Sequence, residues 1–155
     1  MTLGSRIAAS LFAAAAAAVL AAAAFCSYAI AHGASARWRI LFRVLCHGIE
    51  SRCLELWGVS MPICARCTAI YAGLIVGIVL FVIVPSLRRR LVPSVVLALA
   101  IAPLAIDGLT QAFRFRESTN SLRVLTGMIA ASAFALWAMS HIERGSRRSE
   151  EGTLS

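Results

Sequence analysis

The sequence contains few charged residues and no lysine. Charged side chains make up 14% of the 155 residues, whereas a soluble globular domain has about 25%. Apolar residues make up 60% of the chain, and this composition excludes an ordinary soluble protein. The formal net charge is nevertheless +8, because arginines outnumber the acidic residues.

The arginines do not form the kind of surface that binds nucleic acid. Such a surface carries basic side chains on one solvated face, with aromatic residues between them. Here the arginines fall in short clusters between apolar runs, an arrangement typical of membrane proteins. The sequence therefore predicts contact with a lipid bilayer and no nucleic acid partner.

Four apolar runs are long enough to cross a bilayer as helices, which takes about 17–25 residues. They cover about residues 7–31, 68–84, 92–109 and 122–142. Short turns between the last three predict an all-α integral membrane protein that folds as a four-transmembrane antiparallel helix bundle. Residues 1–142 then form a single transmembrane domain, and the polar stretch 143–155 is predicted to be a disordered tail.

The first apolar run has a competing interpretation, because Ala34-Ser35-Ala36 resembles the cleavage site of a signal peptide. The apolar core of a signal peptide has about 7–15 residues. The run 7–31 is longer, which favours a retained transmembrane helix. Next in the chain, Arg39 and Arg43 lie among the apolar side chains of residues 37–45, which predicts a short helix in the membrane interface or an extension of the first helix.

An even number of spans places both termini on one face of the membrane, and the first and third loops on the other. Seven arginines lie on the terminal face and eight on the loop face, so their number does not orient the chain. The triplet Arg88-Arg89-Arg90 lies in a very short turn and is the clearer signal. It favours a multi-pass protein of the cell membrane with its termini in the cytoplasm.

A cysteine-rich loop, residues 32–67, joins the first two spans and contains four of the five cysteines. Two of these form the step Cys64-Ala65-Arg66-Cys67, whose spacing brings both sulfurs to one side of a helical turn. Paired thiolates suit zinc or another thiophilic metal ion with tetrahedral coordination. The candidate metal ligands are Cys46, His47, Cys64 and Cys67, with Cys53 less favoured.

Two other interpretations of the cysteines stay open. In an oxidising compartment the four loop cysteines form two disulfides, in one of three pairings. Alternatively, Cys64 and Cys67 form a reversible disulfide, because a helix N-terminus and a cation such as Arg66 both lower the pKa of a thiol.

Polar residues around the end of the third span form a second candidate group. Asp107 and Gln111 are four apart and share one helical face. A carboxylate at a membrane boundary indicates either a functional group or a structural ion pair, with Arg116 or Arg123 as the expected partner. If the protein is an enzyme, which the sequence leaves open, the candidate catalytic residues are Asp107, Gln111, Arg116 and Arg123. Ser118 or Asn120 is expected to cap the fourth span.

Small residues recur along one side of the second span. Ala69, Gly73 and Gly77 follow one another at intervals of four, and such a ridge permits another helix to approach closely. The short turn after this span predicts that the third helix packs there. That packing would place Asp107 close to the thiols and join the two polar groups in one site.

Two segments of the chain carry a recognisable set of motifs. The first consists of Cys46-His47, Arg52, Gly58, Pro62, Cys64-Ala65-Arg66-Cys67-Thr68 and Tyr71-Ala72-Gly73. The second consists of Asp107-Gly108-Leu109-Thr110-Gln111, Arg116-Glu117-Ser118-Thr119-Asn120, Leu122-Arg123 and Thr126-Gly127. Together they resemble the signature of the domain of unknown function 2085 family, although Ala69 stands where that family more often has glycine. The resemblance implies a small multi-span membrane protein of bacteria or archaea and brings no established activity.

Three functions are compatible with these residues. The first is a membrane protein with a Cys/His metal site at the membrane surface. The second is a thiol-disulfide oxidoreductase coupled to quinone, by analogy with small four-helix membrane enzymes that place a CxxC step at the mouth of the bundle. The third is a non-catalytic assembly subunit whose loop face binds a protein partner. No substrate can be read from the sequence.

Overall fold

The computed structural model describes residues 1–89, 92–113, 115 and 117–153. Four helices within these ranges are long and apolar enough to cross a membrane, as predicted. They are α1 (Leu3–Ala31), α2 (Ala65–Ile83), α4 (Ser94–Ala112) and α5 (Asn120–Thr153), and the short helix α3 (Pro85–Arg89) follows α2.

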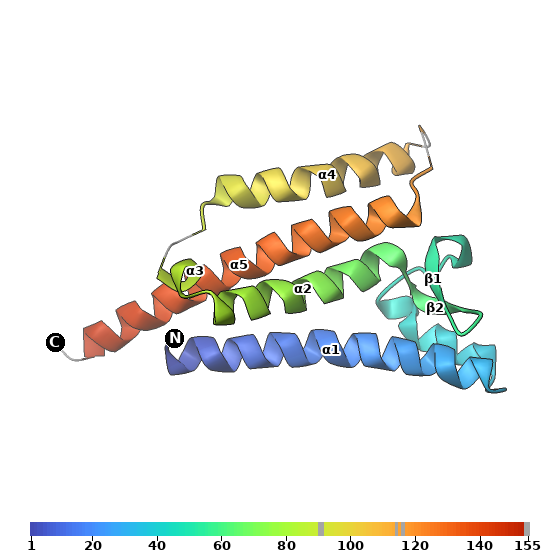
Figure 1. Cartoon of the computed structure of the whole chain (residues 1–155), viewed down its shortest axis with the longest axis horizontal. Helices are drawn as coiled ribbons and strands as arrows, with labels where there is room; N and C mark the ends of the chain where they lie inside the picture. The colour runs from blue at the N-terminus through green and yellow to red at the C-terminus, as the bar shows by residue number, and fades with distance from the viewer. Residues whose placement is uncertain (90–91, 114, 116, 154–155) are drawn as a thin grey trace.

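The long helices lie side by side in the order α1, α2, α5, α4 (Figure 1). Each long helix runs in the opposite direction to the long helix before it in the chain. The N-terminus lies at the end of the molecule towards which α5 runs, whereas the cysteine-containing connection lies at the other end (Figure 1). The turn from α4 to α5 is at that same cysteine end.

The glycine ridge of α2 packs against α5. A Cβ atom on Gly73 would lie 2.7 Å from the carbonyl oxygen of Met128, and one on Gly77 would lie 2.5 Å from that of Ser132. These distances leave no room for a Cβ atom, so both positions require glycine unless the helices move apart. The prediction that the third helix packs on this ridge is therefore wrong, because the fourth helix does. The α5 residues that face the ridge are also small or lack a side chain, namely Gly127, Ala131 and Ala135.

The connection between α1 and α2 contains a β-hairpin, so the prediction of an all-α chain is wrong at this point. The hairpin consists of β1 (Cys53–Leu56) and β2 (Val59–Cys64), which pair antiparallel. Trp57 and Gly58 form its two-residue turn with φ angles of 54° and 72°, the positive values that tight hairpin turns favour.

Two 3₁₀ helices precede the hairpin. The first, η1 (Ala36–Val44), lies where a short helix was predicted after the first span, and the second is η2 (Glu50–Arg52). Ser35 caps η1 by accepting a hydrogen bond from the backbone N–H of Arg37 at 3.3 Å.

Helix α5 continues well past residue 142, whereas the sequence predicted a disordered tail from residue 143. Glu143 is 1% exposed, and its carboxylate accepts hydrogen bonds from the Ser5 hydroxyl and from the backbone N–H of Thr2 at 3.1 Å. Arg147, one helical turn further on, donates to the same carboxylate at 2.8 Å. These bonds satisfy the buried charge and tie the first turn of α1 to α5 beyond residue 142, and the helix continues to Thr153.

Candidate functional site

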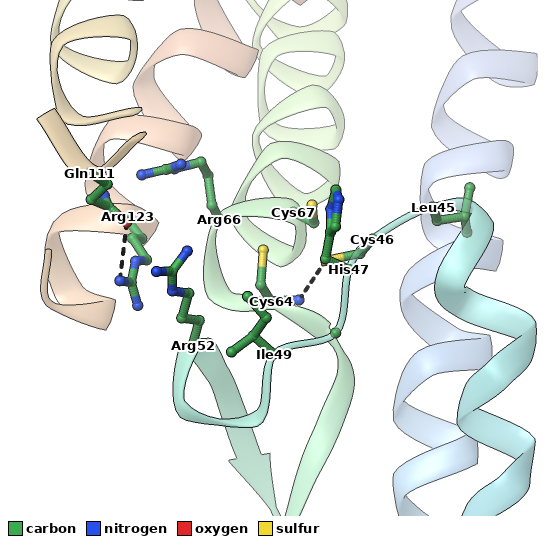
Figure 2. Close-up of a pocket in the computed structure, with 11 residues that line it drawn as sticks. Leu45, Cys46, His47, Ile49, Arg52, Cys64, Arg66, Cys67, Gln111 and Arg123 are labelled. Atoms are coloured by element: carbon green, nitrogen blue, oxygen red, sulfur yellow. Dashed lines mark hydrogen bonds between the residues drawn. The ribbon is translucent and has the colours of Figure 1, made fainter. Parts of the chain in front are cut away.

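Three cysteine sulfurs lie together where the hairpin leads into α2. The Sγ atoms of Cys46, Cys64 and Cys67 all lie within 4.8 Å of one another. The backbone N–H of Cys64 donates to the sulfur of Cys46 at 3.2 Å (Figure 2). All three are free thiols. We call these residues the sulfur cluster.

Different parts of the connection position the three sulfurs. Cys46 follows the end of η1, and Gly48 then turns the chain with a φ of +60°. A side chain at Gly48 would be strained there and would press on the carbonyl of Pro62, 3.2 Å from its Cβ position. Cys64 ends β2 and is the N-cap of α2, and Cys67 lies in the first turn of that helix.

His47 and Cys53, the other two predicted ligands, lie outside the sulfur cluster among the described residues. His47 is exposed and lines the same pocket as Cys46, Cys64 and Cys67 (Figure 2). Cys53 is paired with Cys64 in the hairpin register, but its thiol donates to the carbonyl of Ile49 at 3.2 Å. His47 is therefore the better placed of the two to complete a metal site.

The sulfur of Cys64 is favoured as a thiolate. A hydrogen bond from the Cys67 thiol lowers the pKa of Cys64 to about 5, and further hydrogen bonds from the first turn of α2 act in the same direction. The N-terminus of a helix favours an anion because its first N–H groups lack intrahelical partners. In contrast, burial raises the pKa of Cys53 to about 11, and the neighbouring sulfurs of Cys64 and Cys46 add to the rise.

The sulfur cluster opens onto a pocket of about 380 Å³ that has a basic side. Arg52 from η2, Arg66 from α2 and Arg123 from α5 line it, and their guanidinium groups lie on one side of the thiols (Figure 2). In the sequence analysis, Arg66 entered as a cation that lowers the pKa of the neighbouring thiols and Arg52 as a motif residue, and neither was among the candidate site residues. The signal was present, since Arg66 lies inside the CxxC step and Arg52 directly precedes Cys53.

A series of polar contacts joins the basic side of the pocket to α4. The guanidinium of Arg66 pairs with the carboxylate of Asp107, which is 3% exposed. The Nε2 of Gln111 donates to this carboxylate at 3.0 Å, and its Oε1 accepts from the Nη2 of Arg123 at 3.2 Å. We call this series the polar relay.

The polar relay continues from α5 to the hairpin through Asn120. The Nη1 of Arg123 donates to the side-chain oxygen of Asn120 at 2.8 Å, and the side-chain amide of Asn120 donates to the carbonyl of Cys53 at 3.3 Å. The expected helix cap is wrong, because the hydroxyl of Thr119, and not Ser118 or Asn120, accepts from the backbone N–H of Leu122 at 3.3 Å.

The structure brings most of the second candidate group to the thiols. Gln111 and Arg123 line the same pocket as the sulfur cluster, and Asp107 is joined to it by Arg66. Arg123 reaches Asp107 through Gln111, not directly as the sequence suggested. Arg116, the remaining candidate, lies outside the described residues.

Comparison with known proteins places this site within a family. The family model described as "Predicted membrane protein (DUF2085)" matches residues 46–137, which is more than half of the chain. The chain belongs to this family. The DUF2085 match begins at the first residue of the sulfur cluster and contains the whole polar relay.

Two curated relatives of this DUF2085 protein are uncharacterised archaeal proteins. One, from Methanocaldococcus jannaschii, is 37% identical over 91 residues, which are 58% of this chain and 58% of the relative. The other, from Methanothermobacter thermautotrophicus, is 36% identical over 96 residues, which are 61% of this chain and 85% of the relative. Both sources are archaeal, so they do not support a bacterial assignment. No solved structure matches the chain.

Proposed function

We propose that this DUF2085 protein binds one zinc ion, or another thiophilic metal ion, through the thiolates of Cys46, Cys64 and Cys67. The observation that carries the proposal is the sulfur cluster, whose atoms lie within 4.8 Å of one another. In a tetrahedral site with Zn–S distances of about 2.3 Å, the sulfurs are about 3.8 Å apart. The cluster needs to contract by about 1 Å at most to reach that geometry.

His47 is the proposed fourth ligand, because it is exposed and lines the same pocket as the sulfur cluster. With His47 bound, the site has the closed Cys₃His set of structural zinc sites. The metal would then fasten the end of η1 to the start of α2. Ligation also requires deprotonated sulfurs, and the lowered pKa of Cys64 supplies one at neutral pH.

Metal analysis of the full chain, purified in detergent under reducing conditions, tests the proposal. The wild type should carry close to one metal ion per chain, and Cys64→Ser and Cys67→Ser should carry almost none. Cys26→Ser is the matched control, because Cys26 is a buried thiol of α1 outside the sulfur cluster. A wild type without metal, or equal loss in the control, would contradict the proposal.

A thiol-disulfide oxidoreductase is the second candidate, favoured by the position of Cys64. A thiolate at a helix N-cap with a second thiol one turn later is the arrangement of reactive dithiols. In this reaction the dithiol of Cys64 and Cys67 becomes a disulfide, and two electrons and two protons pass to a quinone. Quinone reduction by the reduced protein, lost in Cys67→Ser, would support this function over the metal site.

We also propose a membrane arrangement for the site. The four long helices form an antiparallel transmembrane bundle with the termini in the cytoplasm and the sulfur cluster near the opposite surface. The opposite directions of successive long helices support this arrangement (Figure 1). It would leave the pocket open to solutes or to a protein partner outside the cytoplasm.

A further inference from the structure

The pocket beside the sulfur cluster carries more basic charge than its acidic neighbours balance. Three guanidinium groups line it, those of Arg52, Arg66 and Arg123. Among the described residues, Asp107 is the carboxylate that pairs with one of these arginines, Arg66. The thiolate favoured at Cys64 adds a second negative charge, so three guanidinium groups face two anions and one positive charge is in excess. Like charges held close together in a partly buried pocket repel one another, because the local dielectric is low.

The arginines also keep hydrogen-bond donors unused. Arg123 is 5% exposed, and both of its Nη atoms donate hydrogen bonds within the polar relay. Its buried Nε has no hydrogen-bond partner among the described residues. The buried Nε of Arg66 lacks a partner as well. A buried donor without a partner costs free energy, which an acceptor at either Nε would recover. The guanidinium of Arg52 forms no hydrogen bond or ion pair with a described residue.

We propose that this pocket binds a phosphate group, as inorganic phosphate or a phosphate ester, through Arg52, Arg66 and Arg123. Arginine suits this ligand because its planar fork of N–H groups matches the oxygens of a phosphate. The N-terminal end of α2 borders the same pocket, and its dipole favours an anion there. The N–H groups of its first turn already bond the sulfur of Cys64, so the arginines supply the direct contacts. The site goes beyond the metal proposal and does not depend on it, since arginines bind the anion and sulfurs bind the metal.

Titration of inorganic phosphate into the full chain, in a neutral detergent at low salt, tests the inference by calorimetry. The wild type should bind phosphate saturably, and Arg52→Gln should weaken binding about 10–100-fold, as expected for loss of hydrogen bonds to a charged group. Arg52 is the best position for this test because it is exposed and its guanidinium forms no hydrogen bond or ion pair with a described residue. Arg123→Gln should weaken binding at least as much if the variant folds.

The matched control is Arg148→Gln, which removes the same charge from an exposed position at the far end of α5. Phosphate binding in this control should equal that of the wild type. Equal weakening by Arg52→Gln and Arg148→Gln, or no saturable binding by the wild type, would overturn the inference.

Two further arms separate the anion site from the metal site and identify the source of the phosphate. After treatment with a chelator the wild type should still bind phosphate, and loss of binding on chelation would overturn the role assigned to the arginines. Nanodiscs with phosphatidylglycerol should compete with inorganic phosphate if the natural ligand is a lipid headgroup, with phosphatidylcholine nanodiscs as reference. Phosphate binding that neither nanodisc reduces would identify a soluble phosphate as the ligand.

Discussion

Arg66, which lies between the two cysteines of the CxxC step, forms an ion pair with Asp107 on α4. Gln111 donates to the same carboxylate from one helical turn further along α4. Asp107 is buried, and a buried charge that loses its partner is strongly destabilising. The residue between the metal-ligand candidates therefore also fastens α4 to α2.

Replacement of Asp107 by asparagine keeps the shape of the side chain and removes its charge. We expect Asp107→Asn to lower the free energy of unfolding by about 2 kcal/mol, since a hydrogen bond to a charged group is lost. If zinc is bound, its affinity should also change, on the order of 10–100-fold, as when groups that orient metal ligands are altered. Thermal unfolding in detergent and a competitive zinc titration measure the two effects. Glu55→Gln, at an exposed position of β1, is the control, and equal stability of the two variants would refute the prediction.

The two thiols at the ends of the hairpin should differ in reactivity with pH. In the metal-free protein, the rate of Cys64 alkylation by iodoacetamide should rise between about pH 4 and pH 6 and then level off, since its pKa is about 5. Cys53 should stay almost unmodified up to about pH 9, because its pKa is about 11 and the thiolate is the reactive form. Mass spectrometry of the labelled peptides separates the two sites. Equal rates at pH 7 would contradict the assignment.

The lowered pKa of Cys64 also determines the direction in which the stability of the fold changes with pH. The pKa of Cys64 is lower in the folded protein than its ordinary value of 9.0. The contribution of this thiolate to stability is therefore fully present above about pH 9 and is lost as the pH falls towards 5. In a Cys64→Ser variant this part of the pH dependence should be absent from unfolding curves measured without metal.

The contact between α2 and α5 should not tolerate one added methyl group. We expect Gly77→Ala to destabilise the protein by about 1–3 kcal/mol, because the new Cβ would lie 2.5 Å from the carbonyl oxygen of Ser132. Gly145→Ala is the matched control, because this helical glycine has no atom within 4 Å of its Cβ position. The control should be neutral or stabilising by up to about 1 kcal/mol, as alanine favours a helix. Thermal unfolding in detergent compares the stabilities of the two variants with that of the wild type.

Labelling in whole cells tests the proposed membrane topology. Single cysteines introduced at Ser35 and Thr119, in a background without native cysteines, should react with an impermeant maleimide from outside the cell. A cysteine at Arg144, on the terminal end of α5, should react only after the membrane is permeabilised. Ser35 and Thr119 on opposite sides would rule out the four-span arrangement.

The spans could be predicted from the sequence because length and hydropathy alone define them. The hairpin could not, because its turn uses Trp57-Gly58 and not a residue pair typical of tight turns. The cysteine spacing predicted Cys46, Cys64 and Cys67 as joint ligands, and all three sulfurs do come together. The sequence did not show the turn at Gly48, which follows Cys46 in the chain. Proximity along the chain suggested α4 as the neighbour of the glycine ridge. The matching repeat Gly127, Ala131, Ala135 already pointed to α5, where shape complementarity outweighs proximity.

Helix α4 is attached to the rest of the protein by different interactions from those of the other long helices. Only 6% of its most apolar window is buried inside the protein, against 39% for α5, so close packing contributes little to its attachment. It lies against α5 and reaches α2 through Asp107. Helices α2 and α5 pack through small residues, whereas the cysteine end of α4 is held by the contacts of Asp107 with Arg66 and of Gln111 with Arg123. The contacts that hold this end of α4 therefore also complete the pocket, and a ligand bound by those arginines would stabilise the arrangement with α4 packed in place.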